Sequence, residues 1–304
     1  MKVSHSRNRP AKTQDPAIEA ILREVSSENL EALVKLLAFP RHYVSNKRAN
    51  RKARDLLLKQ ARTMGYAPVL QGSFDNIVMT SRDATDGPCL LLGAHYDSVP
   101  DSPGADDNAS AVAVCLECAR LMRKHDLGPA MIVLFNREED GLLGSSEFVA
   151  ELAEENVWRI KEAHIFEMVG YRDPTPGSQT LPPGLPIRMR DIGDFLALLA
   201  NSGSNRIAED LVSLAATYVP ESVVVALKVY LGIEKAFGDL NRSDHKPFWE
   251  AGIASIMWTD TSEFRNPHYH LASDKPGTLD YDFMADVTKL ALARVASWTR
   301  PPRP

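Results

Sequence analysis

Residues 88–110, PCLLLGAHYDSVPDSPGADDNAS, join a buried-strand pattern to a dense group of metal-type ligands. The apolar run CLLL leads directly into His95 and Asp97, and Asp106 follows at the start of a stretch of small residues. Side chains two positions apart in a strand leave the same face. His95 can therefore bind a cation while Asp97 holds its imidazole, as carboxylates commonly do behind metal-bound histidines. We interpret the stretch as half of a metal site, whose other ligands must lie downstream.

The bulk composition is that of a globular protein. Of the 304 residues, 44% are hydrophobic and 25% are charged, which supplies a core for one large or two small domains. The formal net charge is -5, and no long acidic or basic block occurs. We therefore expect neither a nucleic-acid partner nor a membrane surface. No run of about 18 apolar residues suggests a membrane span.

The N-terminal segment and the cysteines bear on location and domain count. Residues 1–16 are polar and basic and no apolar segment follows them, so no secretion signal is expected. Cys89, Cys115 and Cys118 are too few for a disulfide framework, which is typical of a reducing compartment. We predict a cytoplasmic protein, or a secreted one if the sequence has been trimmed. No internal repeat is visible, so a flexible leader (1–16) should precede a single domain (17–300).

The middle of the chain alternates strand-like and helix-like segments. Continuous apolar runs at 89–95, 130–136 and 163–170 are typical of strands covered on both faces, and helical patterns at 109–124 and 141–152 separate them. This rhythm predicts an α/β fold, a three-layer αβα sandwich with a mixed, mostly parallel central sheet. Active sites in such folds gather where the strands end.

The second half is less regular. Residues 171–187 contain five prolines and predict a long rim loop, which is either a functional lid or a surface insertion. The pattern then favours helix over 191–218, a strand at 221–230, a short helix at 243–252 and a buried strand at 252–260. An amphipathic helix from Tyr281 to Trp298 should close the domain.

Further ligand candidates follow the predicted strands. Glu138 and Glu139 come just after the strand at 130–136, and neighbouring residues of an extended segment point in opposite directions. One glutamate can then bind metal while the other acts as a general base. Glu167 lies within an apolar strand and needs a cation or a partner to offset its desolvation. The segment NPHYH near the C-terminus adds His268 and His270.

Carboxylates and imidazoles drawn from successive strand ends match a hydrolytic site with two metal ions. Zinc is the first choice for this ligand mixture. One carboxylate must then bridge two ions that lie about 3.5–4 Å apart.

The motifs HYD, GADDNAS, EEDGLLGS, FEMVGY, SDHKPF and NPHYH occur in this order between residues 88 and 275. Together they resemble the co-catalytic zinc aminopeptidase family, which also includes glutamate carboxypeptidase II, glutaminyl cyclase and the transferrin receptor ectodomain. The resemblance implies two zinc ions. One is held by His95, Asp106 and Glu167 and the other by Asp106, Glu139 and His270, with Asp106 as the bridge.

The resemblance also implies roles for residues around the ligands. Glu138 would be the general base and Asp97 the partner of His95. Tyr269 matches a tyrosine that stabilises the developing oxyanion in some relatives, whereas others place it where this chain has Leu240. For Asp244 and His245, a structural role and substrate contact stay open. Asp107 and Asn108 are expected to cap the helix that follows.

The expected activity is hydrolysis of peptides or amino-acid amides at a free N-terminus. Two zinc ions would activate a bridging water, Glu138 would take its proton and later pass it to the leaving amine, and Tyr269 would stabilise the oxyanion.

Three alternatives use the same fold. A glutaminyl-peptide cyclotransferase tends to alter the GADDNAS and EEDGLLGS segments, which are intact here. A catalytically silent binding protein would have lost ligands. A carboxypeptidase or dipeptidase would need a cation for the substrate carboxylate, for which Arg172, Arg188 and Arg265 are candidates. Side-chain preference and oligomeric state stay open.

Overall fold

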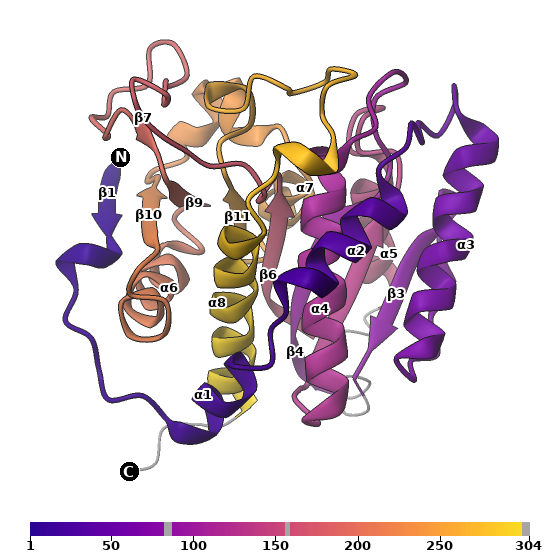
Figure 1. Cartoon of the computed structure of the whole chain (residues 1–304), viewed down its shortest axis with the longest axis horizontal. Coiled ribbons are helices and arrows are strands. Elements are labelled where there is room, and N and C mark those ends of the chain that lie inside the picture. The colour runs from indigo at the N-terminus through magenta and orange to yellow at the C-terminus, as the bar shows by residue number, and fades with distance from the viewer. Residues whose placement is uncertain (82–86, 156–158, 300–304) are drawn as a thin grey trace.

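A computed structural model describes residues 1–81, 87–155 and 159–299 of the chain. Nine described strands form one sheet in the order β1-β10-β9-β11-β6-β4-β5-β3-β2, with helices on both faces (Figure 1). The predicted α/β architecture with a mixed central sheet is confirmed.

Four parallel strands make the centre of the sheet. They are β4 (Pro88–His95), β5 (Ala130–Phe135), β6 (Arg159–Glu167) and β11 (Ser255–Thr259), in the spatial order β11-β6-β4-β5. Their apolar sequences suit strands that are buried on both faces. Because all four run in the same direction, their carboxyl ends meet at one edge of the sheet.

The outer strands make the sheet mixed. They are β2 (Val69–Gln71), β3 (Asn76–Thr80), β9 (Phe195–Ala200) and β10 (Val223–Lys228), with β1 (Lys2–His5) at one edge. Four of the eight neighbouring pairs are parallel, and these include every pair within the central group. At the other edge β2 and β3 pair antiparallel as a hairpin.

The expected flexible leader is partly structured. Residues 2–5 form β1, which pairs antiparallel with β10, and the Val224 amide donates a hydrogen bond to Ser6 Oγ (3.0 Å). The prediction is wrong here because KVSH carries almost no strand pattern of its own. Its conformation comes from the open edge of β10, which offers unpaired backbone groups.

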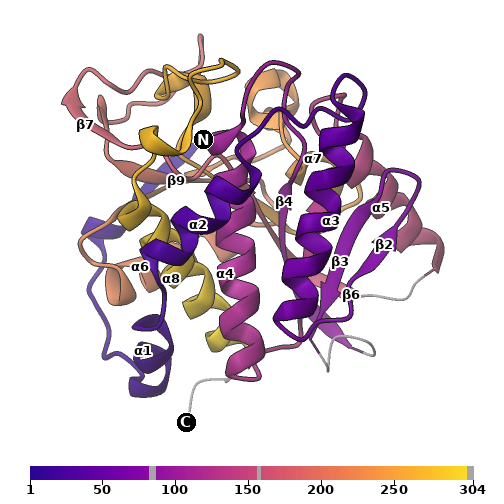
Figure 2. The ribbon, with the colours of Figure 1, turned by 45° about the vertical axis from the view of Figure 1, so that its right-hand side comes forward.

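Helices cover the two faces unequally. One face carries α1 (Pro16–Leu22), α2 (Ser27–Leu37), α3 (Lys47–Thr63), α4 (Ala111–Lys124), α6 (Asn205–Tyr218) and α8 (Tyr281–Thr299), which share the largest core cluster. The other face carries α5 (Leu143–Glu155) and α7 (His245–Glu250), whose Phe148 and Phe248 pack on Phe135. Figure 2 brings α3 and the edge strands β2 and β3 forward. These faces and the sheet are the three predicted layers.

The helix predicted over 191–218 is correct only in its second half. Phe195–Ala200, FLALLA, is strand β9 between β10 and β11, and α6 begins at Asn205. A continuous apolar run of six residues fits a buried strand or a buried helix equally well, and the neighbouring strands decide between them. Strand β7 (Asp173–Pro176) at the start of the Pro-rich segment pairs with β8 (Ile192–Gly193), just beyond its end, in a small two-stranded sheet.

No helix within the described part of the chain is long and apolar enough to cross a membrane.

Candidate metal centre

The side chains expected to bind metal meet at the carboxyl edge of the central strands. His95 is the last residue of β4 and Glu167 the last of β6, while Glu138 and Glu139 lie just beyond β5. His270 comes from the loop that follows β11. The parallel pairing brings these residues together from positions far apart in the sequence.

The first half of the centre surrounds His95, which is 1% exposed. Its Nε2 lies 3.3 Å from Asp107 Oδ1, 3.5 Å from Glu167 Oε2 and 3.9 Å from Glu138 Oε2. His95, Asp107 and Glu167 form one group whose ligand atoms all lie within 4.8 Å of one another.

The second half surrounds His270. Its Nε2 lies 3.1 Å from Asp107 Oδ2 and 3.5 Å from Glu139 Oε2, and the three residues form another group within 4.8 Å. The two carboxylate oxygens of Asp107 therefore face two different histidines. This is the arrangement required of a residue that bridges two cations.

Asp106 does not take the bridging position expected of it. Its Oδ1 accepts a hydrogen bond from the Gly170 amide (2.9 Å), and its Oδ2 accepts one from Asn266 Nδ2 (2.6 Å). Both oxygens therefore serve the backbone and an amide behind the centre. Asp107 takes the bridging position that the sequence assigned to Asp106, since it faces the histidines instead of capping the next helix.

Asp97 lies behind His95 as predicted. Its Oδ1 is 3.3 Å from His95 Nδ1. The same carboxylate accepts the backbone amides of Glu138 (3.2 Å) and Glu139 (3.3 Å). Asp97 thus ties the end of β4 to the segment after β5 and orients three residues of the centre together.

The electrostatics show a site with an excess of negative charge. Burial raises the pKa of Glu138 and of Glu139 well above the usual value, and neighbouring carboxylates add to the shift. Burial disfavours a charged His95, yet the carboxylates of Glu138 and Glu167 raise its pKa well above 6.5. Burial also opposes ionisation of Asp107, but the neighbouring imidazoles of His270 and His95 lower its pKa. Such a group of carboxylates calls for a compensating cation.

The donor set fits a zinc-type cation. Among the described residues, neither ring nitrogen of His95 nor Glu139 Oε1 has a partner in hydrogen-bond geometry, although all three atoms are buried. Buried polar atoms without partners are uncommon in folded proteins, and a metal ion satisfies them. Imidazole combined with carboxylate is a ligand mixture that suits zinc.

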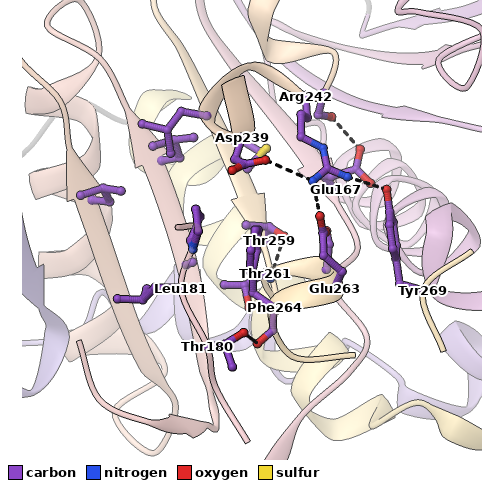
Figure 3. A pocket seen from close by; sticks show the side chains of 18 of the residues that line it. Glu167, Thr180, Leu181, Asp239, Arg242, Thr259, Thr261, Glu263, Phe264 and Tyr269 are labelled. Atoms are coloured by element: carbon purple, nitrogen blue, oxygen red, sulfur yellow. Dashed lines mark hydrogen bonds and ion pairs between the residues drawn. The ribbon is translucent and has the colours of Figure 1, made fainter. Parts of the chain in front are cut away.

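Tyr269 lies beside the centre. Its ring stacks on that of His270 at a centroid distance of 3.8 Å, and its hydroxyl accepts a hydrogen bond from Arg242 Nη2 (2.8 Å). Figure 3 shows Arg242 held between Tyr269, Glu263 and Asp239. Leu240, the alternative position for the tyrosine, is a buried apolar residue and offers only its carbonyl, which bonds to His245 Nε2 (3.0 Å).

Other sequence candidates belong to none of the ligand groups found among the described residues. Asp244 is fully buried, which raises its pKa to about 7, and His245 packs against Trp249. The His268 ring bonds to Ser273 Oγ (3.0 Å) and belongs to none of the ligand groups found in the described residues.

The arginines considered for a substrate carboxylate are directed elsewhere. Arg172 pairs with Asp280 (2.6 Å), and Arg188 is exposed. Arg265 is buried and donates hydrogen bonds to Gln179 Oε1 (2.8 Å) and to the Phe195 carbonyl (2.8 Å). Arg172 and Arg265 are thus engaged in contacts within the fold.

Several supporting residues were not predicted. Ser243 Oγ donates a hydrogen bond to Glu167 Oε2 (2.6 Å). Asp274 accepts the backbone amides of Asp106 (2.8 Å) and Asp107 (3.1 Å). In the sequence, only their polar character and their position close to the SDH and NPHYH motifs could have pointed to Ser243 and Asp274.

An apolar pocket opens from the centre. It measures about 130 Å³, and at one end the side chains of Asp107, Glu138, Glu139, Glu167 and His270 line it. Its other end is lined by apolar residues of the Pro-rich segment, of the strands β9, β10 and β11, and of their loops: Leu181, Leu185, Ile187, Met189, Leu199, Leu227, Met257 and Phe264. The Pro-rich segment is thus part of the pocket and not only a surface insertion.

The α/β fold and the histidine–carboxylate centre at its strand ends define a metallohydrolase class of protein. The chain belongs to Peptidase family M28, whose model matches residues 76–295. A relative from Escherichia coli (strain K12), the uncharacterized protein YfbL, is 33% identical over 294 residues, which cover 89% of this chain and 88% of that one.

Solved structures show the same fold. BSAP, a zinc aminopeptidase from Bacillus subtilis, is 27% identical with a TM-score of 0.56, and the match covers 74% of this chain and 50% of that one. The LapA aminopeptidase of Legionella pneumophila is 20% identical with a TM-score of 0.73, over 96% and 79% of the two chains. A glutaminyl cyclase from Porphyromonas gingivalis is also 20% identical, with a TM-score of 0.65 over 91% and 99%.

Proposed function

We propose that the chain is a zinc-dependent aminopeptidase that holds two zinc ions, one at His95, Asp107 and Glu167 and one at Asp107, Glu139 and His270. The observation that carries the proposal is Asp107, whose two oxygens lie 3.3 and 3.1 Å from two different histidines. The family and its aminopeptidase relatives support the activity and the choice of zinc.

A zinc pair in this centre supplies an activated water and polarises the scissile carbonyl group. Glu138 is the proton carrier. Burial raises the pKa of its carboxylate, which favours taking a proton at neutral pH and giving it later to the leaving amine. Tyr269 directs its hydroxyl proton at the developing oxyanion, while Arg242 holds the phenol oxygen in place.

The shape of the pocket supports a substrate class. An apolar chamber that opens directly from the ligand residues accommodates the side chain next to the scissile bond. Leu, Met and Phe side chains bury the most apolar surface there, at about 25 cal/mol per Å² removed from water. We infer that peptides with a large apolar N-terminal residue are preferred over those with a charged or small one.

The glutaminyl cyclase alternative shares the fold but gains no specific support. Most of the exposed lining of the pocket is apolar, which suits an aliphatic or aromatic side chain better than the polar glutaminyl amide. A silent binding protein is disfavoured too, because the centre has a complete set of ligand side chains.

The test combines zinc content with hydrolysis. Purified protein should hold two zinc ions per chain and cleave leucyl anilide but not its N-blocked form, with activity lost to chelator and restored by zinc. Glu138→Gln should keep the zinc and lose at least about a hundredfold in kcat. A content of one zinc ion per chain would contradict the proposal that Asp107 bridges two ions. Cyclisation of a glutaminyl peptide without anilide hydrolysis would favour the cyclotransferase.

A further inference from the structure

Arg41 is buried directly beneath the metal centre. Its side chain is 0% exposed, although the guanidinium carries a permanent charge. Five backbone carbonyl oxygens accept its hydrogen bonds: those of Leu37, Phe39, Tyr96, Pro103 and Gly104. Within the described structure no carboxylate is hydrogen-bonded to it. Because all of its hydrogen bonds go to backbone carbonyl groups, this guanidinium holds the backbone in place and does not form an ion pair with one particular carboxylate.

Three of these carbonyls belong to the loop that joins the ligands of β4 to Asp107. Arg41 Nε donates to the Tyr96 carbonyl (2.6 Å), between His95 and Asp97. Nη1 donates to the Pro103 carbonyl (2.7 Å) and Nη2 to the Gly104 carbonyl (2.9 Å). One guanidinium therefore holds both ends of the loop 96–104.

The loop is packed tightly around this side chain. Gly104 has a φ of +60°, and a Cβ built on it would lie 3.0 Å from Arg41 Nη1 and 2.3 Å from the Asp107 carbonyl oxygen. The Arg41 amide also donates to Ser98 Oγ (3.0 Å) in the middle of the loop. The backbone conformation that presents Asp107 thus depends on contacts with Arg41.

The backbone of Arg41 extends the connection to β5. Its carbonyl oxygen accepts a hydrogen bond from Asn50 Nδ2 (2.9 Å). Asn50 and Asn136 exchange two side-chain hydrogen bonds (2.9 and 3.1 Å), and Asn136 directly follows β5, two residues before Glu138. The segments that carry His95, Asp107 and Glu138 therefore meet at a single buried residue.

We propose that Arg41 is the positioning residue of the metal centre, which holds the loop 96–104 and the end of β5 in the metal-binding geometry. Arg41 is not among the residues that line the pocket, so it acts through the metal ligands and not on the substrate. Its planar fork supplies five donors, whereas a lysine supplies three from one atom and cannot reach both ends of the loop. The inference rests on the proposed zinc site.

The test measures zinc affinity, not turnover. Arg41→Lys keeps the charge but loses the fork, so a chelator competition should show zinc binding at least about tenfold weaker than in wild type, in the range that residues supporting metal ligands contribute. Arg41→Met removes the charge as well and should weaken zinc at least as much.

Arg294→Lys is the matched control. Arg294 is mostly buried, with 13% of its side chain exposed, but it pairs with Glu162 on β6, five residues before the ligand Glu167 at the end of the strand. The Arg294→Lys substitution should lower thermal stability without changing the affinity for zinc. The inference is overturned if Arg41→Lys, folded by circular dichroism, binds zinc as wild type does. It is equally overturned if Arg41→Met binds zinc more tightly, since Arg41 would then act only as a repelling charge. If wild type itself binds no zinc, the proposed function fails instead.

Discussion

The adjacent residues Asp106 and Asp107 are expected to differ sharply in their effect on zinc binding. Asp107→Asn removes one charged oxygen from between two histidines and should weaken zinc binding and reduce kcat by at least about a hundredfold, more than the loss of a supporting residue. Zinc content after dialysis and anilide hydrolysis measure both effects.

Asp106→Asn is its matched control. The oxygens of Asp106 accept hydrogen bonds from the Gly170 amide and from Asn266 Nδ2, so an amide at this position removes an acceptor behind the centre but no metal ligand. Zinc content should stay at the wild-type level. If Asp106→Asn loses zinc and Asp107→Asn keeps it, the bridge belongs to Asp106 after all.

His245 links stability to pH. It is fully buried, which lowers its pKa from 6.5 to about 4, while the hydrogen bond to the Leu240 carbonyl opposes the shift. The unfolded chain therefore binds more protons than the folded chain between pH 6.5 and 4, and stability falls as the pH falls through this window. The loss amounts to about 2 kcal/mol between pH 8 and pH 5.

Urea unfolding of the zinc-free protein at both pH values tests this effect. His245→Gln keeps a donor near Nε2 and cannot titrate, so its stability should fall by about 2 kcal/mol less than that of wild type over the same interval. An equal fall in the two proteins would assign the pH dependence to other groups.

At the scale of elements, β1 protects an edge of the sheet. It covers β10, whose sequence VVVALK is apolar and buried throughout. Deletion of residues 2–8 should expose this strand and cause aggregation on heating, because an open apolar edge pairs with other chains. Light scattering and zinc content are the measurements, and zinc content should not change.

Arg9→Ala removes only a partly exposed ion pair with Glu209 and should alter stability by less than about 1 kcal/mol.

Sequence patterns alone are enough to predict some strands but not others. Runs such as CLLLGAH and AMIVLFN are too apolar for an edge and predicted the central strands correctly. FLALLA could not be assigned from its own residues, because only pairing with β10 and β11 makes it a strand. The ligand types and the elements that carry them were readable, whereas the choice between Asp106 and Asp107 was not. That choice depends on hydrogen bonds with the Gly170 amide and with the side chains of Asn266 and Asp274, which are distant in sequence.

For the whole molecule, the metal centre and the fold stabilise one another. Five ligand residues from four separate segments converge on one edge of the sheet, and unfolding separates them. Each zinc ion that binds only the folded chain adds about 4 kcal/mol of stability at a free concentration a thousand times its Kd. At about 2–3 °C per kcal/mol for a chain of this size, removal of both ions by a chelator should lower Tm by about 20 °C.

Two histidines of one loop test this coupling. His270→Ala removes a ligand and should reduce the zinc-induced rise in Tm to about half or less, because the second position loses one of its three side chains. His268→Ala, two residues earlier, removes a ring that bonds only to Ser273 among the described residues and should keep the full rise. Differential scanning fluorimetry with and without chelator gives both values. Equal rises in the two variants would show that His270 does not hold zinc, and the second metal position would then have to be abandoned.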